Sequence, residues 1–188
     1  MAETRWARML RRVRALHSQW NQVTTDLTLD QVNHHEREGV LPIAFSLHHY
    51  VLIEDHTVAR RIYDEPPIWK RDGWETRVGA TVPSVTRGTP IAVAETLRFN
   101  DYDAWLGYQA AVFSRTEASL ESLADERWDD IIFEMLPDQL KDGFLDLVVG
   151  DAPVCLGDML DVFITNHGSR HLGEIEHARS LIGLKGVG

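Results

Sequence analysis

The chain has 188 residues, of which 44% are hydrophobic and 26% are charged, with a formal net charge of -10 and a single cysteine. This length predicts a single domain over residues 1–188, with a core that needs no disulfide bonds. The acidic balance argues against binding to nucleic-acid phosphates, and no apolar run is long enough to span a membrane, so neither partner is expected. No secretory signal pattern is present, which favours a cytoplasmic protein.

Charge is unevenly distributed along the chain. Residues 1–20 contain five arginines and one acidic residue, whereas residues 116–161 contain thirteen acidic residues and two basic ones. An arginine-rich start is found in targeting peptides and nucleic-acid arms, but here the arginines alternate with an apolar stripe. We interpret them as the solvated face of a first helix that pairs with the acidic half of the chain.

Apolar residues recur every three or four positions in four long segments, which predicts four helices. In chain order the expected helices cover residues 6–24, 42–63, 101–123 and 153–182. Asn100 is the expected N-cap of the third helix, Pro66 and Pro67 forbid continuation of the second, and Gly183 ends the fourth. The fourth helix would be about 45 Å long, which is typical of a helical bundle.

The link between the second and third helices, residues 64–99, holds four prolines and three glycines and is unusually long. Such a link is usually functional or partly structured. Its tryptophans, Trp69 and Trp74, either cover a pocket or pack on the bundle. A shorter helix is expected over residues 128–135, and residues 144–149 form a further apolar patch. With no alternating strand pattern, the sequence predicts an all-α four-helix bundle.

Histidine is the most informative residue type, with nine copies in the chain. His167 and His171 are four residues apart in the fourth helix, so both project from one face with Cβ atoms about 6 Å apart. Two imidazoles placed in this way can converge on one cation, although such pairs also occur on surfaces and in cores. Cys155 lies twelve residues before His167, about 18 Å along the same predicted helix, and is not expected to join them.

A third ligand should come from a facing helix, because metal sites in bundles are assembled between helices. The second helix offers three candidates, and periodicity does not choose between them: His48, His49 and His56. The histidines of the first helix and of the following linker are interpreted as surface residues: His17, His34 and His35.

Two segments resemble the DinB-like superfamily. Residues 42–56, PIAFSLHHYVLIEDH, resemble its second helix, and residues 167–174, HGSRHLGE, resemble its last helix, where H-x-x-x-H-x-G precedes Glu or Gln. The residues from Trp69 to Arg77 resemble the loop after the second helix in some members. The resemblance implies up-down-down-up connectivity. It also implies a divalent metal ion, zinc or nickel, held by His49, His167 and His171, and a close helix contact at Gly173.

Members of this superfamily include S-transferases and isomerases that use a small thiol such as mycothiol or bacillithiol. The resemblance therefore implies a metal-dependent thiol transferase or isomerase, with a small thiol and an electrophile as substrates. A homodimer is one candidate assembly, and the sequence does not determine the oligomeric state. Glu174 and Arg170 are the candidate catalytic residues. Glu174, or alternatively Glu54, would tune a ligand or move a proton, and Arg170 would bind a carboxylate. The alternatives are a non-enzymatic metal-binding bundle associated with stress and a metal-dependent hydrolase.

Overall fold

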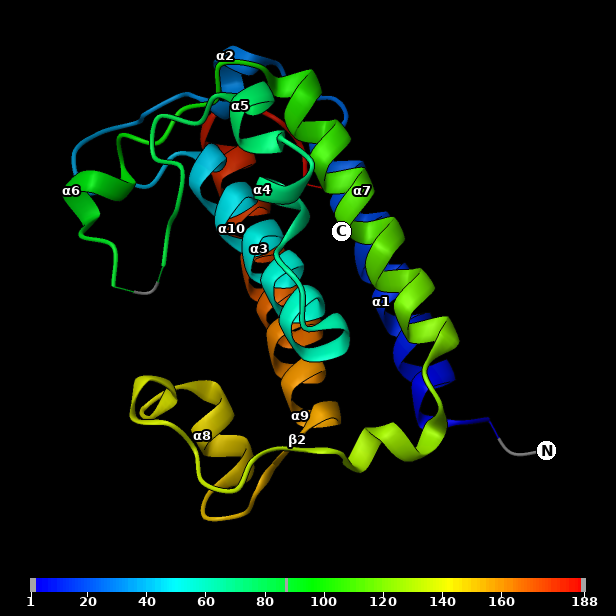
Figure 1. Ribbon diagram of the computed structural model, residues 1–188. Helices are drawn as coiled ribbons and strands as arrows, with labels where there is room; N and C mark the ends of the chain where they lie inside the picture. The colour runs from blue at the N-terminus through cyan, green and yellow to red at the C-terminus, as the bar shows by residue number, and fades with distance from the viewer. Residues whose placement is uncertain (1–2, 87, 187–188) are drawn as a thin grey trace.

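Four long helices lie side by side in the computed structural model, which describes residues 3–86 and 88–186 (Figure 1). They are α1 (Arg5–Thr24), α3 (Ile43–Val58), α7 (Tyr102–Ser122) and a last helix that ends in α10 (His167–Leu181). Helix α1 contacts α7 and α10, and α3 contacts the same two helices. Following the chain in Figure 1, the directions are up, down, down and up, so the predicted all-α bundle is confirmed. The two ends of the predicted domain range, 1–188, lie outside the described residues.

The helix ends follow local signals in the sequence. Thr4 caps α1 by accepting the Ala7 N–H, and Asp101, one residue after the expected Asn100, caps α7 in the same way. Helix α3 continues into a π-helical turn, η1 (Ala59–Tyr63), and stops before the two prolines. The last helix begins later than expected, with Cys155 as its N-cap, and comprises three pieces: α9 (Leu156–Leu160), the π-helical turn η4 (Asp161–Asn166), and α10.

The long link between α3 and α7 is a geometric necessity, because two helices that run in the same direction require the chain to return along the bundle. The return contains α4 (Ile68–Arg71), α5 (Trp74–Val78) and α6 (Ile91–Ala94). The buried Asp55 carboxylate of α3 anchors it by accepting the backbone N–H groups of Ile68 and Trp69 at 3.1 and 3.0 Å and the Tyr108 hydroxyl at 3.0 Å.

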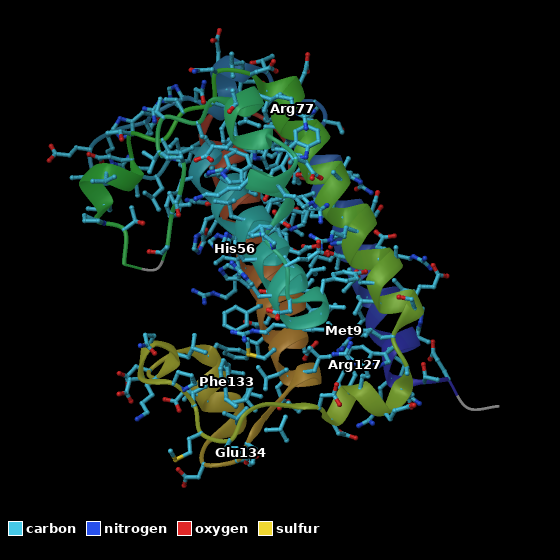
Figure 2. The ribbon with its side chains drawn as sticks, in the orientation of Figure 1. Met9, His56, Arg77, Arg127, Phe133 and Glu134 are labelled. Atoms are coloured by element: carbon cyan, nitrogen blue, oxygen red, sulfur yellow. The ribbon has the colours of Figure 1, made fainter. Side chains whose placement is uncertain are left out.

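Both tryptophans of this link pack on the bundle, which settles their role. Trp69 is 2% exposed and its ring lies 4.8 Å from that of Tyr108. Trp74 lies against Tyr108 and Gly107 of α7, with the Arg77 guanidinium stacked 3.4 Å from its ring centroid (Figure 2). The alternative, that these rings cover a pocket, is wrong.

A second excursion leads from α7 to the last helix and forms a lobe below the bundle in Figure 1. The helix expected over residues 128–135 is wrong: a 3-10 turn, η2 (Asp125–Asp129), is followed by strand β1 (Ile131–Phe133), which pairs antiparallel with β2 (Val154–Cys155). Consecutive β-branched and aromatic residues suit a strand once a partner is present. Arg61 of η1 stacks on Phe133 at 4.8 Å and ties this lobe to the bundle (Figure 2). The remaining short helices are α2 (Leu29–Val32), η3 (Asp138–Leu140) and α8 (Phe144–Val149), which is the predicted apolar patch.

Three of the five arginines of α1 pair with acidic residues of later segments, as the charge distribution indicates, and the other two pair with Glu3. Arg5 contacts Asp129 at 2.8 Å, Arg12 contacts Asp161 at 3.0 Å, and Arg14 contacts Glu117 at 3.2 Å. Such exposed pairs stabilise a fold weakly, by ~0–1 kcal/mol each, so the arginine-rich start is a solvated helix face. Across residues 3–86 and 88–186, none of the helices has both the length and the apolar character that a bilayer crossing requires.

His17, expected at the surface, is instead 2% exposed in the bundle core. Its Nδ1 lies 2.8 Å from a Glu117 carboxylate oxygen, and its Nε2 lies 3.1 Å from Glu54, which also accepts the Thr116 hydroxyl. Burial alone would lower the pKa of His17, but the charge of Glu54 and hydrogen bonds to Glu54 and Glu117 outweigh it and raise the pKa. Burial would raise the pKa of Glu54, but the charge and hydrogen bond of His17 lower it.

The His17–Glu54 pair should make folding stability depend on pH. A raised pKa in the folded state contributes stability below the unfolded value of 6.5, and this contribution is lost as the pH rises through the folded pKa. We therefore expect the difference in unfolding free energy between wild type and His17→Gln to be larger at about pH 6 than at about pH 9. Urea unfolding at both pH values measures it. An equal difference at the two values would show that His17 is neutral in the folded protein.

At Gly168, α10 lies close to both α1 and α3. A Cβ atom there would lie 2.6 Å from Tyr50 Cζ of α3 and 2.7 Å from Leu16 Cδ2 of α1, and the Gly168 carbonyl accepts the Trp20 indole N–H at 3.2 Å. The close contact expected at Gly173 is wrong, because Gly173 is exposed and a Cβ there would meet no described atom within 4 Å. The two glycines are five residues apart, so they face different directions on the helix.

Alanine at these two glycines should have opposite effects on stability. Gly168→Ala forces a clash with Tyr50 and Leu16, and overpacking of this kind typically costs ~1–3 kcal/mol. Gly173→Ala meets open space and gains up to ~1 kcal/mol from helix propensity. Urea unfolding of both variants measures the difference, with Gly173→Ala as the matched control. Equal stability of the two variants would contradict the close approach at Gly168.

Candidate metal centre

His167 and His171 stand on the first two turns of α10, directly after the π-helical turn η4. Their Nε2 atoms are 3.0 Å apart. Nitrogens that share one cation at ~2.0–2.1 Å must lie roughly this close to each other. π-helical turns are often found beside functional sites because the extra residue changes which side chains face the neighbouring helix. The pair therefore has the spacing of two ligands of one ion.

His49 of α3 faces this pair. Its ring centroid lies 5.1 Å from that of His167 and 5.1 Å from that of His171. One nitrogen atom from each of the three side chains lies within 4.8 Å of the other two. The second and last helices of the bundle thus bring three imidazoles together, and this cluster could hold a metal ion.

The other two histidines of α3 lie away from the cluster. His48 is fully buried, with its Nε2 3.4 Å from the Pro83 carbonyl oxygen and its ring edge-on to Trp69. It therefore faces the crossover link, and burial lowers its pKa to about 4. His56 is exposed (Figure 2). Adjacent residues of a helix point about 100° apart, which separates His48 from His49.

The surroundings of the cluster favour the neutral form of its imidazoles. Burial, together with the neighbouring His171, lowers the pKa of His49 to about 4. Burial and the other two histidines lower the pKa of His167 to about 3. At neutral pH both rings are uncharged, which is the form that binds a cation. Three imidazoles suit zinc or nickel as well as copper and iron, so the residues present fit the metal ion that the sequence resemblance implies.

Glu174 contacts one of these histidines. The His171 Nδ1–H group donates to Glu174 Oε2 at 2.6 Å, and the Ser46 hydroxyl of α3 donates to the same oxygen at 3.0 Å. The hydrogen bond from His171 lowers the pKa of the Glu174 carboxyl. A proton held on Nδ1 leaves the lone pair on Nε2, which faces His167. Sequence analysis did not identify Ser46, since a serine on a helix carries no signal of its own.

The three histidines lie on the wall of a cavity of about 720 Å³. Helix α3 and the last helix supply one side. The two excursions supply the others, through four residues at and before α6 and through residues 139–145 around α8; the four are Thr86, Thr89, Ile91 and Ala94. Figure 1 shows α6 and α8 on the same side of α3 and α10, at opposite ends of this space. Half of the lining residues have apolar side chains, and a few polar groups lie among them, as in a site for a small molecule. The sequence did not indicate these walls, because their position depends on how the excursions fold back.

The other residues singled out from the sequence lie in three different places. Arg170 is exposed and lines the cavity, three residues after His167. Glu54 belongs to the His17 pair in the bundle core. Cys155 caps α9 and takes no part in the histidine cluster.

Fold and site together define a helical bundle with a candidate three-histidine metal centre between its second and last helices. The model of the DinB superfamily matches residues 3–175, and the chain belongs to that superfamily. A solved structure described as a conserved protein from Enterococcus faecalis superposes with a TM-score of 0.75 at 16% identity, covering 96% of this chain and 98% of the other. That likeness shows the fold alone. No curated protein matches the chain.

Removing the charge of Glu174 should weaken metal binding without unfolding the bundle. Partners that orient a ligating histidine typically contribute about 10- to 100-fold in metal affinity. We expect Glu174→Gln to lower zinc affinity in this range, measured by competition with a chromophoric chelator.

Glu176→Gln is the matched control for that variant, because Glu176 lies on the same helix two residues further on and is no member of the histidine cluster. Its zinc affinity should equal that of the wild type. An unchanged affinity in Glu174→Gln would contradict the role of Glu174 in orienting His171.

Proposed function

We propose that this protein is a divalent-metal-dependent enzyme that joins a small thiol to an electrophile, or isomerises the electrophile by way of the thiol. The observation that carries the proposal is the placement of His49, His167 and His171 on the wall of a largely apolar cavity of about 720 Å³. Three histidines leave coordination positions open, which is typical of catalytic rather than structural metal sites.

In this proposal His49, His167 and His171 hold zinc or nickel. A divalent cation there would lower the pKa of a coordinated thiol or water and so increase the fraction of the nucleophilic form. Glu174 acts through His171, because its Oε2 atom accepts the Nδ1–H group of His171 at an Nδ1–Oε2 distance of 2.6 Å. The apolar walls exclude water from the reacting groups, and Arg170 binds an anionic group of the thiol or of the electrophile.

The surroundings of Glu174 favour a thiol over water as the nucleophile. A hydrolase benefits from a base that takes a proton from water within hydrogen-bond reach. Glu174, the carboxylate beside the cluster, already accepts hydrogen bonds from His171 and Ser46 on one oxygen. Thiols ionise near ~8.5, far more readily than water, and therefore need less help from a base.

The test is turnover with thiols. Zinc-loaded and nickel-loaded protein is incubated with bacillithiol, mycothiol or glutathione and an aryl halide, and loss of thiol is followed. We expect metal-dependent turnover with at least one thiol. His171→Ala should lower it by about 100-fold or more, because it removes one of three ligands.

His177→Ala is the control, since His177 is an exposed residue of the same helix outside the cluster. It should retain wild-type turnover. Stoichiometric metal without any thiol reaction would indicate a non-enzymatic metal-binding bundle, and metal-dependent ester cleavage without thiol would indicate a hydrolase. Either result contradicts the proposal.

A further inference from the structure

Arg170 lines the cavity and, unlike most arginines of the chain, has no partner among the described residues. Arg71, Arg115 and Arg179 each contact a carboxylate within 2.6–2.8 Å. Arg170 makes no hydrogen bond or ion pair within residues 3–86 and 88–186, and its side chain lines the cavity. An unpaired guanidinium at the wall of an apolar cavity is a binding group for an anion, because its fork of N–H donors matches a carboxylate.

The charge of Arg170 reaches into the cavity. It contributes, after burial and the neighbouring histidines, to the lowered pKa of His167, and it also lowers the pKa of the Glu174 carboxyl. Asp142, from the segment before α8, also lines the cavity. Arg170 therefore supplies a positive charge on the α10 side of the cavity, where an anionic group can bind it.

Apolar side chains form a large part of the remaining walls. Phe45 and Ile53 of α3 and Phe163 of η4 form the side next to the cluster. Ile91 of α6 and Phe144 of α8 line the cavity from its two ends and are 54% and 45% exposed. Large apolar residues that face each other across a cavity are covered when an apolar ligand enters, which makes its binding favourable.

We propose that this cavity binds a molecule with an elongated apolar body and one carboxylate, the carboxylate on Arg170 and the body between Ile91 and Phe144. The volume of about 720 Å³ is within the range that holds a ligand of drug-like size. The inference deepens the proposed function by naming the class of electrophile that shares the cavity with the thiol. It rests on that function for the reaction, whereas the binding itself depends on Arg170 and the apolar walls.

The binding test uses decanoate and decanol, which have the same chain length and differ in the head group. Affinities for zinc-loaded full-length protein are measured by titration calorimetry, with decyltrimethylammonium as the cation of matched chain length. Decanoate should bind most tightly and the cation most weakly. Arg170→Gln should lower decanoate affinity by about tenfold or more and leave decanol affinity unchanged, because a hydrogen bond to a charged group is lost. Arg170→Lys should retain part of the preference.

A second pair of variants tests the apolar walls. Phe144→Ser should lower the affinities for decanoate and decanol by similar factors, since it removes apolar contact area from the cavity. Leu147→Ser is the matched control, because Leu147 is 84% exposed on α8 and does not line the cavity among the described residues. It should change neither affinity. Circular dichroism verifies that all variants fold.

The same titrations with His171→Ala separate this inference from the proposed function. If zinc binding fails but the Arg170-dependent preference for decanoate persists, the inference stands and the metal centre does not. If zinc binds but decanoate shows no preference over decanol and the cation, the inference is overturned alone. A preference that survives Arg170→Gln and disappears in His171→Ala also overturns it, because the carboxylate would then bind the ion.

Discussion

The contact at Gly168 determines how the rest of the site is arranged. Its hydrogen atoms occupy the space where any side chain would meet Tyr50 of α3 and Leu16 of α1. Helix α10 can therefore approach both helices one residue after His167, which brings that imidazole to 5.1 Å from the ring of His49. A wider separation of the two helices would move the third ligand away from the pair on α10. The absence of a side chain at Gly168 thus controls the geometry of the histidine cluster.

Buried polar groups hold the helices in register around this contact. The His17–Glu54 pair joins α1 to α3 in the core, and Asp55 joins α3 to the crossover link through two backbone N–H groups. Such groups are costly to bury without partners, so sliding one helix past another would leave charges unpaired. His49 of the candidate metal centre lies five residues before Glu54 on the same helix and is positioned by the same contacts. The position of His49 in the histidine cluster therefore depends on the buried polar contacts that α3 makes elsewhere in the core.

Periodicity and helix-capping residues predicted the four long helices, and the i, i+4 spacing predicted which residues of α10 share a face. The choice of His49 over His48 came from resemblance to a family, because both stripes of α3 contain apolar residues and both histidines are buried. The misjudged residues were those whose environment depends on distant segments: His17 needs Glu54 and Glu117, and the strand at residues 131–133 needs residues 154–155. The sequence likewise did not indicate that the close helix contact lies at Gly168 and not at Gly173, because the neighbours of a helical glycine are known only from the fold.

The direction of the helices has a consequence for how the sequence of this protein can evolve. The long helices α3 and α7 follow each other in the chain and run in the same direction, so the chain needs a long return segment between them. This return segment forms one end of the cavity, and the segment between α7 and α9 forms the other end. The histidines and Arg170 stand on the long helices, while Ile91, Phe144 and other lining residues stand on two separate excursions. Insertions, deletions and substitutions in either excursion can alter what fits without disturbing the ion site. Chemistry and selectivity can thus diverge independently within one bundle.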